Sequence, residues 1–395
     1  MSKYKILVYP NGDKTGCFKY RVLDPHVKLQ ELSKDFWVEI NYEPNWEDIG
    51  YLKQFNMVFF HRALDPQIEK TLLILDKLHL MGIKTMMDLD DWVPGPDHPL
   101  YHIVKMQKID KHLIEIAKKV NYISVATPAL LNKFKTYNKN VFHFPNSINF
   151  NEKQFNPNPT QSERIRFGCV MGSSHLKDIQ ILNGFTTRMN EFKDKIQLVL
   201  AGYDVRGQKI MIDPTTNQTK AVPIKPEESV WYEYEKIFTN KYEFLTNQKY
   251  IDFLKTFKNE DYISNDVEYR RIWTKPITSY GTAYNELDVL MVPLVENEFN
   301  YYKSNLKLLE AGAHKKAVIV QNYEPYVHDI KHGENCLVVD SKKNHKDWNK
   351  HIKTLVNNPD LIKELGENLH KHVKENYSLE KTTSYREEVY KQILN

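Results

Sequence analysis

Short apolar runs alternate with helix-like segments through the first 150 residues of the chain. The strand-like runs are Tyr4–Tyr9, Trp37–Ile40, Met57–Phe60, Lys84–Leu89, Tyr122–Ala126 and Val141–Phe144. Helix-like segments lie between them, notably Pro66–Met81 and Tyr101–Lys118. Strands that alternate with helices are typical of a doubly wound α/β domain, which is the fold class we predict here.

A second alternating series begins at Ile165–Met171, after a polar, proline-bearing stretch that suits a linker. Its later elements are the strand Leu287–Leu294, a helix that opens near Ser304, and the strands Ala317–Val320 and Cys336–Val339. Ser304 is a good N-cap residue for that helix. The chain should therefore form two Rossmann-like domains that face each other across a cleft.

The predicted helix after Ser304 carries an ordered polar row. At 3.6 residues per turn, Lys303, Lys307, Glu310 and His314 fall on one face, whereas a helix beside a sheet usually buries an apolar side. Open parallel sheets bind ligands beyond the carboxyl ends of their strands. Lysines and a helix N-terminus attract phosphate there, and a carboxylate can accept from a ribose diol. The row indicates a site for a nucleoside diphosphate.

The spacing K-x-x-x-K-x-x-E-A-G, which ends at Gly312, is followed by an apolar strand and by Gly333-Glu334-Asn335. This pattern resembles the donor half of GT-B glycosyltransferases of the retaining family 4 type, and the likeness continues to Asn376-Tyr377-Ser378. The run 145–149 also resembles the segment that closes the first domain in that family. The resemblance implies domains over 1–150 and 151–375, and a C-terminal helix over 376–395 that returns to the first domain.

In that family, the glutamate that matches Glu310 holds the ribose of the sugar nucleotide. A second glutamate, eight residues earlier, contacts the transferred sugar; Tyr302 stands at that position here, so the resemblance implies only the ribose contact. The turn Gly172-Ser173-Ser174 follows the first strand of the second domain and resembles the family's glycine-containing loop. Its amides and the nearby Lys177 would contact the donor phosphates, although such a turn is often only a helix cap.

Several charged residues follow strands of the first domain. His61 and Arg62 end one strand and can reach the carboxyl edge of the sheet, although a histidine on an apolar strand is often a core residue. Asp88, Asp90 and Asp91 lie at the end of the next strand. They either cap backbone amides or bind acceptor hydroxyls, and a metal role is disfavoured.

Arg21 follows the loop after the first strand. That loop, 11–18, resembles the family's flexible loop beneath the acceptor. Arg21 therefore either faces the acceptor or a phosphate, or it is a surface ion-pair partner.

The stretch of about eighty residues over 204–283 is far longer than a usual connection. Its first part resembles a β-hairpin, and Ser229–Phe238 and Tyr250–Phe257 look helical. One interpretation is an insertion that packs its own aromatic residues. The other places Arg270, Arg271, Lys275, Tyr269 and Trp273 at the cleft, where arginine suits phosphate and aromatic rings suit sugars.

Composition adds few constraints. The 395 residues include 55 Lys and Arg against 51 Asp and Glu, and the resulting net charge of +4 is too weak to imply nucleic acid or membrane. Cys17, Cys169 and Cys336 are far apart and suggest a reducing compartment, and the fifteen histidines form no zinc spacing. The sequence shows no signal peptide and no apolar run long enough to span a membrane, so we expect a cytoplasmic protein.

These patterns and the family resemblance predict a glycosyltransferase that moves a sugar from a nucleoside diphosphate sugar to the hydroxyl of a saccharide or glycan, and the resemblance implies retention of the anomeric configuration. No cofactor is expected, and no metal is required. We assign catalysis to His61, Lys307 and Glu310. Donor binding is assigned to Gly172, Ser173, Ser174, Lys177, Lys303, Ser304, Lys307, Glu310 and Arg271. Acceptor binding is assigned to Arg21, Arg62, Asp90 and Asp91.

Two alternatives stay open from the sequence. One is a virus-type enzyme that acts on modified bases of DNA, which would favour a basic stripe. The other is a non-catalytic subunit that binds a nucleotide sugar, suggested by Tyr302 in place of glutamate. The donor base, the sugar, the acceptor and the oligomeric state are not set by the sequence.

Overall fold

The computed structural model describes residues 3–11, 16–192, 194–204, 208–212, 219–224, 228–238, 269–340 and 344–395. The chain forms two compact units. Unit 1 comprises residues 1–155, 296–309 and 371–395, and unit 2 comprises residues 156–295 and 310–370. Each unit is built on a six-stranded parallel sheet with helices packed on it, which confirms the predicted fold of two Rossmann-like α/β domains.

The sheet of unit 1 has the order β2-β1-β3-β4-β5-β6. Its strands are β1 (Tyr4–Tyr9), β2 (Phe36–Ile40), β3 (Met57–His61), β4 (Lys84–Leu89), β5 (Tyr122–Val125) and β6 (Val141–His143). All six were predicted, and no end differs from the prediction by more than one residue. The order reverses at β1, so the carboxyl ends of β1 and β3 flank the switch point at which open α/β sheets bind ligands.

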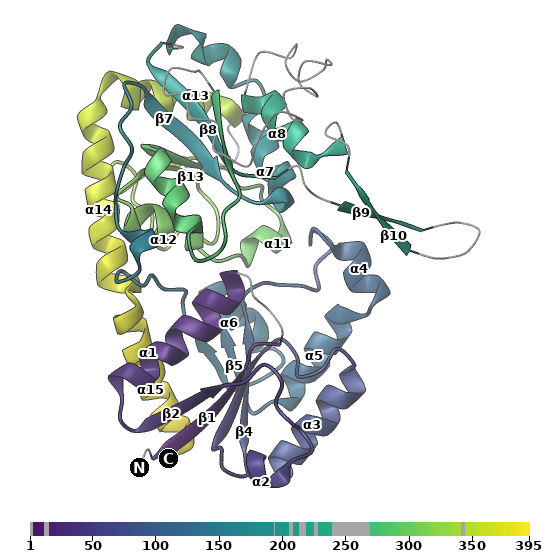
Figure 1. Cartoon of the computed structure of the whole chain (residues 1–395). Helices are drawn as coiled ribbons and strands as arrows, with labels where there is room; N and C mark the ends of the chain where they lie inside the picture. Colours follow the sequence, from purple (N-terminus) through teal and green to yellow (C-terminus); the bar gives the residue numbers. More distant parts are fainter. Residues whose placement is uncertain are drawn as a thin grey trace. The chain divides into compact units, whose positions relative to one another are not determined.

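Both faces of this sheet are covered. The flanking helices are α1 (Asp24–Leu32), α2 (Ile49–Leu52), α3 (Ile68–Leu80), α4 (Tyr101–Met106), α5 (Ile109–Lys119), α6 (Pro128–Phe134) and α15 (Leu379–Leu394). Successive strand residues point to opposite faces: Met57 and Phe59 join the cluster that contains α1 and α15, whereas Val58 and Phe60 join the cluster of α3 and α5. Figure 1 shows α1 beside α15 within this unit.

The helix predicted over Tyr101–Lys118 is in fact two helices. Lys108 lies between α4 and α5 with a φ of 55°, in the left-handed region. A residue in that conformation cannot continue an α-helix. The chain therefore changes direction at Lys108, and α4 and α5 are separate helices.

The sheet of unit 2 has the order β11-β8-β7-β12-β13-β14. Its strands are β7 (Ile165–Val170), β8 (Ile196–Tyr203), β11 (Tyr269–Trp273), β12 (Val289–Val292), β13 (Ala317–Gln321) and β14 (Leu337–Val339). The helices of this unit include α7 (Leu176–Ile179), α8 (Val230–Phe238), α13 (Asn344–Asn357) and most of α14 (Pro359–Tyr377). The apolar residues of α8 and α13 pack with those of β7 and β8 in one core cluster.

The segment Tyr269–Trp273 is a strand of this sheet rather than part of a separate insertion. It pairs with β8, and the pairing slips by one residue opposite Gly202. Gly202 has a φ of 99°, and a Cβ there would lie 2.2 Å from the carbonyl oxygen of Met171. Only glycine tolerates that bulge.

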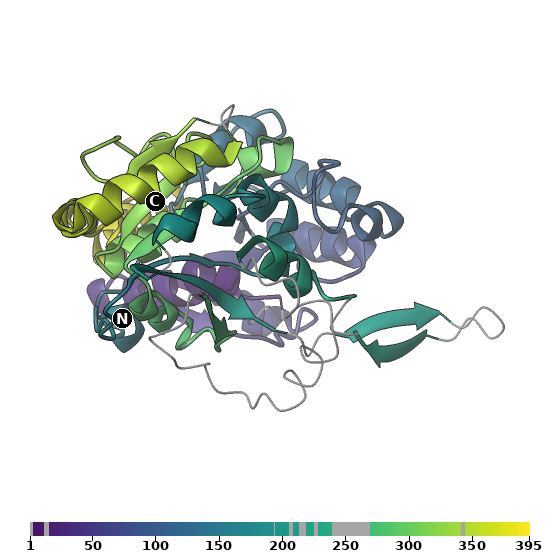
Figure 2. The same cartoon turned by 90° about the horizontal axis from the view of Figure 1, so that it is seen from above.

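The remainder of the long connection matches the prediction where it is described. The strands β9 (Gln208–Ile212) and β10 (Thr219–Pro223) pair in antiparallel fashion, and Figure 2 shows them extending away from the sheet of unit 2. Helix α8 coincides with the predicted Ser229–Phe238. The predicted helix Tyr250–Phe257 lies outside the described residues.

Helix α12 (Leu306–Ala313) begins later than the sequence suggested. The carbonyl oxygen of Asn305, not of Ser304, accepts its first hydrogen bonds, from Leu308 and Leu309. Lys303 consequently lies outside the helix, after the short α11 (Glu298–Tyr301), and does not share its face with Glu310. The division between the two units falls within α12, after Leu309.

Candidate functional site

Glu310 is buried completely in unit 2 and is held by two tyrosines. The hydroxyl of Tyr284 donates to its Oε2 at 2.7 Å, and the hydroxyl of Tyr280 donates to the same oxygen. Burial, followed by the nearby carboxylate, raises the pKa of both hydroxyls well above the ordinary value. Both tyrosines therefore keep their protons and fix the orientation of the carboxylate.

The tyrosines belong to a short helix, Tyr280–Glu286, that precedes β12. This helix is of the 3₁₀ type, and both tyrosine hydroxyls nevertheless reach Glu310. His314, next after α12, stacks on Tyr284 with ring centroids 5.5 Å apart, and its Nδ1 lies 3.1 Å from Asn285 Oδ1. His314 thus supports Tyr284. Lys307, one turn before Glu310 on α12, is only partly buried.

The loop Gly172-Ser173-Ser174 leaves the carboxyl end of β7, and all three residues are exposed. The hydroxyl of Tyr234, on α8, donates to the carbonyl oxygen of Gly172 at 3.0 Å. The same hydroxyl accepts from the backbone N–H of His175 at 3.0 Å. The long connection therefore supplies a side chain that fixes the shape of this loop.

Asp178 joins this loop to the neighbouring strand end. Its Oδ2 lies 2.7 Å from His175 Nδ1, and its Oδ1 accepts from the backbone N–H of Val295 at 3.0 Å. Val295 follows β12, the strand next to β7 in the sheet. The expected helix after the loop is only the single turn α7, and Lys177 is exposed on it.

Arg271 and Trp273 do not take the positions that the cleft interpretation required. Arg271 is 3% exposed, donates through Nε to Glu235, and lies 5.1 Å from the ring centroid of Tyr203. Trp273 is buried in the core of unit 2, 5.3 Å from the same ring. Trp273 is thus a core residue, as the alternative expected, but it packs in the main core of unit 2 and not within a separate insertion, because β11 is a strand of the main sheet.

In unit 1, the register of the sheet brings three polar residues together. His61 pairs with Asp88 across β3 and β4, and Asp88 pairs with Ser124 across β4 and β5. Ser124 Oγ donates to Asp88 Oδ1 at 2.5 Å, and His61 Nδ1 lies 3.4 Å from Asp88 Oδ2. The other ring nitrogen of His61, Nε2, makes no hydrogen bond to any residue that the structure describes, and it lies 3.7 Å from Asp90 Oδ1.

Arg21 is buried beneath this group rather than exposed to an acceptor. Its Nη2 and Nε contact the two oxygens of Asp88 at 2.6 and 3.1 Å, and its Nη1 donates to the carbonyl oxygen of Phe144. Burial alone would raise the pKa of Asp88, but Arg21 and then His61 bring it well below its usual range. Asp88 is therefore ionised and orients His61.

Asp90 and Arg62 form a second pair at the same edge. Arg62 Nη2 donates to Asp90 Oδ1 at 2.8 Å, and the thiol of Cys17 donates to Oδ2 at 2.5 Å. Arg62 has a φ of 62°, in the left-handed region that costs a non-glycine residue energy. Such strain is concentrated at functional sites.

Asp91 differs from its two neighbouring carboxylates. Burial and the charge of Asp90 raise its pKa to about 6, although Arg62, Lys303 and His61 act in the opposite direction. Lys303 was assigned to the donor from the sequence, but the structure places it near Asp91 in unit 1. Asp91 is thus the carboxyl of this group that changes charge close to neutral pH.

Tyr302 stands where the family resemblance expects a sugar-contacting glutamate. Its ring lies 5.7 Å from that of Trp92, and the ammonium of Lys133 lies 4.4 Å from the Trp92 ring. Tyr302 packs against the apolar cluster of unit 1. This position therefore serves packing in unit 1.

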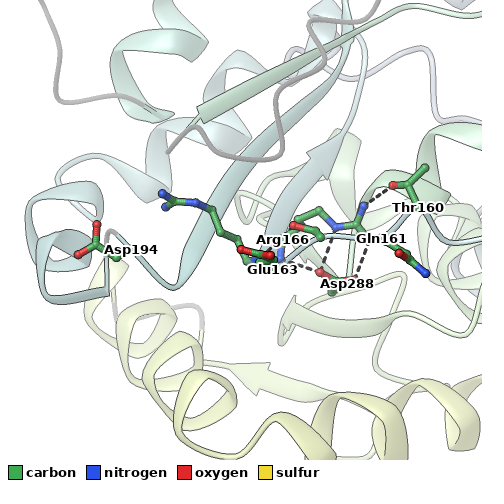
Figure 3. Close-up of a pocket in the computed structure, with 8 residues that line it drawn as sticks. Thr160, Gln161, Glu163, Arg166, Asp194 and Asp288 are labelled. Atoms are coloured by element: carbon green, nitrogen blue, oxygen red, sulfur yellow. Dashed lines mark hydrogen bonds and ion pairs between the residues drawn. The ribbon is translucent and has the colours of Figure 1, made fainter.

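A cavity of about 750 Å³ in unit 2 lies at the wrong end of the sheet for the expected ligand. Figure 3 shows Arg166 between Thr160 and Asp288, and Arg166 Nη2 lies 2.8 Å from Asp288 Oδ1. These residues adjoin the amino ends of β7 and β12. Because ligands of parallel sheets bind beyond the carboxyl ends, we exclude this cavity as the donor site.

Tyr280, Tyr284, Tyr234 and Asp178 were not identified as site residues from the sequence. The contacts of all four residues depend on tertiary structure.

Within the described ranges, no group of three or more His, Cys, Asp or Glu residues is arranged to hold a metal ion. The helices of these ranges also include none with the length and apolarity needed to cross a membrane.

Residues 305–372 match the family model described as glycosyl transferases group 1. No curated protein sequence matches the chain. Among solved structures, HepE from Anabaena in complex with UDP and glucose is 12% identical with a TM-score of 0.60, and the match covers 98% of this chain and 99% of HepE. Sucrose-phosphate synthase from Thermosynechococcus elongatus is 13% identical with a TM-score of 0.62, and the match covers 99% of each chain.

At these identities the two structures establish the fold. The matched family segment begins at Asn305 and contains all of α12, including Glu310. The chain therefore has the GT-B fold, and its segment 305–372 is similar to the group 1 glycosyl transferases.

Proposed function

We propose that this chain is a glycosyltransferase that moves a sugar from a nucleoside diphosphate sugar to an acceptor hydroxyl, with retention of the anomeric configuration and without a metal ion. The observation that carries the proposal is the buried carboxylate of Glu310. This residue lies inside the matched segment, and Tyr280 and Tyr284 hold its side chain. A buried carboxylate whose orientation is fixed suits recognition of a ribose diol, because charge-assisted hydrogen bonds are strong.

For the donor, we assign the ribose to Glu310. Tyr280 is partly exposed, whereas Tyr284 is fully buried. A ribose hydroxyl would therefore displace the Tyr280 hydroxyl from Glu310 and leave the Tyr284 bond in place. The diphosphate is assigned to Lys307, to Ser304, and to the exposed amides and lysine of the loop 172–177.

For the acceptor, we assign hydroxyl recognition to Asp91 and to the pair of Arg62 and Asp90. His61 remains the catalytic candidate of unit 1, since Asp88 fixes its ring through Nδ1 and its Nε2 lies on the side of Asp90. Arg21 is reassigned from acceptor binding to positioning of Asp88. Lys303 is reassigned to this group because of its position near Asp91.

The chemistry requires stabilisation of the leaving diphosphate as negative charge develops on it. Lysine ammonium groups and backbone amides can supply this stabilisation without a metal. In a retaining reaction without a covalent intermediate, the acceptor oxygen attacks the anomeric carbon from the face that the diphosphate leaves. The acceptor proton then passes to the departing phosphate oxygen.

Neither alternative gains support from the described residues. A net charge of +4 is weak for binding duplex DNA. A non-catalytic subunit was suggested by Tyr302, but that tyrosine packs against Trp92, while Glu310 and the loop at Gly172 keep specific supporting contacts. A saccharide or glycan therefore remains the proposed acceptor class.

The test is a screen of UDP-, GDP-, ADP- and CDP-sugars for thermal stabilisation of the protein and for slow hydrolysis. UDP-glucose is the first compound to try, because the HepE structures contain UDP, glucose or UDP-glucose. We expect one nucleotide to raise Tm by several degrees and its sugar to be released. Failure of all four nucleotide classes to bind would refute the proposal.

A further inference from the structure

Unit 1 contains a second cavity, of about 590 Å³, at the carboxyl end of β3. Its volume is typical of sites for small molecules. It is lined by α4, α5, the start of α3 and the segment after β4, and Arg62 is among its lining residues. The assignment of acceptor binding to Arg62 and Asp90 leaves the rest of this cavity without a role.

The wall opposite the strand end is mainly aliphatic, although Gln107 and His112 also belong to it. Helix α5 contributes Ile109, Leu113 and Ile116, whose spacing places them on one face, and α4 contributes Ile103 and Val104. A sugar ring presents hydroxyls over most of its surface, and such a wall would leave those hydroxyls without hydrogen-bond partners. The wall therefore suits an alkyl or aryl group rather than a second sugar.

Most of the polar lining comes from the strand end and from the loops after β1 and β4. It comprises Arg62, His98, Asn11 and Asp65, together with Gln107 and His112 from the helical wall. Arg62 is held by Asp90. Burial, then Arg62 and Lys303, lower the pKa of His98, so its ring is neutral near pH 7. An arginine already paired with a carboxylate and a neutral imidazole suit hydroxyl groups better than a free anion.

The rim of the cavity exposes apolar side chains. Leu100 is 56% exposed and Ile103 is 44% exposed, and both line the cavity. Met106, also on α4, is 74% exposed but does not line it. An apolar ligand group that leaves the cavity would cover the first two residues.

We propose that the acceptor is amphipathic: its hydroxyl-bearing head lies at Arg62 and Asp91, and an alkyl or aryl group joined to the head occupies the aliphatic cavity. The inference rests on the proposed function, because it names the acceptor class of that site. A sugar linked to an alkyl chain is the simplest compound with this chemistry.

The test compares binding of octyl β-D-glucopyranoside and methyl β-D-glucopyranoside to the full chain by calorimetry, below the micelle concentration of the detergent. Burial of each CH₂ strengthens binding by about fourfold, so a partly buried octyl chain should bind at least about tenfold more tightly than methyl. Ile103→Ser should lower octyl affinity several-fold and leave methyl affinity unchanged. Met106→Ser is the matched control and should change neither.

Equal affinity for the two glucosides would overturn the proposal. Equal loss of octyl affinity in Ile103→Ser and Met106→Ser would also overturn it, because adsorption to an exposed apolar surface would explain that result. Neither probe contains a nucleotide, so the outcome is separate from the donor screen. A nucleotide sugar that binds while octyl glucoside shows no advantage removes only the inference about the cavity.

Discussion

Arg21 donates hydrogen bonds to both carboxylate oxygens of Asp88 in unit 1. Its Nη2 lies 2.6 Å from Oδ1, and its Nε lies 3.1 Å from Oδ2. The two side chains are 1% and 0% exposed, so the pair lies almost wholly out of water. Asp88 in turn lies 3.4 Å from His61 Nδ1. A buried charge pair far apart in the sequence thus sets the position of the proposed catalytic histidine.

Loss of Arg21 should destabilise unit 1 strongly. Arg21→Ala leaves the Asp88 carboxylate buried without its counter-charge, and breaking a pair of this kind costs about 3–5 kcal/mol. Because the folded pKa of Asp88 is lowered, its contribution is fully present above the unfolded pKa near 4 and is lost as pH falls through the lowered folded pKa. Urea unfolding should show a large difference between variant and wild type at pH 7 and a smaller difference at pH 3.5. A difference independent of pH would contradict this account.

The strands of unit 1 could be predicted from the sequence because each is a short apolar run between polar turns. The alternation of strands and helices also predicts a parallel sheet with helices on both faces, and these helices bury the sheet. Glu310 was proposed as a site residue from its spacing to the lysines and Gly312, which is local in the sequence, and its role stays a prediction. Local patterns were sufficient for the strands.

Long-range pairing was not predictable in the same way. The segment 269–273 combines arginines with aromatic residues, which suits a ligand site as well as a strand. The segment pairs with β8, about seventy residues earlier in the chain, and is therefore a strand. Arg21 is likewise buried because it pairs with Asp88, and only the folded sheet brings these two residues together.

Trp273→Ala should lower stability and leave substrate affinity unchanged. The side chain is 6% exposed and packs against Tyr203 in the core of unit 2, where removal of a large aromatic costs about 3–5 kcal/mol. Thermal unfolding and KM for the donor sugar nucleotide are the measurements. A raised KM with an unchanged Tm would restore the interpretation that places Trp273 at a ligand.

Asp91 should make both stability and activity depend on pH near 6. Its pKa in the folded chain is raised to about 6, so its stabilising contribution is present below the unfolded pKa near 4 and is lost as pH rises through 6. Asp91→Asn should therefore have a higher Tm than wild type at pH 7.5 and a similar Tm at pH 4.

The same titration should appear in the kinetics. If ionised Asp91 binds the acceptor hydroxyl, kcat/KM for the acceptor should rise through an apparent pKa near 6, which belongs jointly to Asp90 and Asp91. In Asp91→Asn this step should disappear. Persistence of the step in the variant would assign it to another group.

Donor turnover should survive removal of divalent metal. The diphosphate is assigned to Lys307 and to the amides and Lys177 of the loop 172–177, so EDTA should leave hydrolysis of the sugar nucleotide unchanged. Lys177→Met should reduce kcat and leave Tm nearly unchanged, because Lys177 is exposed. Loss of activity in EDTA that Mn²⁺ or Mg²⁺ restores would contradict the assignment.

The ribose assignment can be tested with three substitutions around one carboxylate. Glu310→Gln keeps the size of the side chain but removes its charge, so donor affinity should fall by about 1–3 kcal/mol. Tyr284→Phe removes the hydroxyl that holds Oε2 at 2.7 Å and should also weaken donor binding, by about 1 kcal/mol, because the carboxylate loses its fixed orientation.

Tyr280→Phe is the matched control for these two variants. Its hydroxyl is the one that ribose is proposed to displace, so its removal should leave donor affinity unchanged or improve it slightly. Calorimetry with the nucleoside diphosphate gives the three affinities, and circular dichroism checks that each variant is folded.

The same nucleotide with a 2′-deoxyribose separates a ribose contact from general support of the loop. In the wild type it should bind as weakly as the ribonucleotide binds to Glu310→Gln, and the variant should bind both nucleotides alike. A full ribose preference retained in Glu310→Gln would show that this carboxylate supports the fold of α12 and does not contact the ribose.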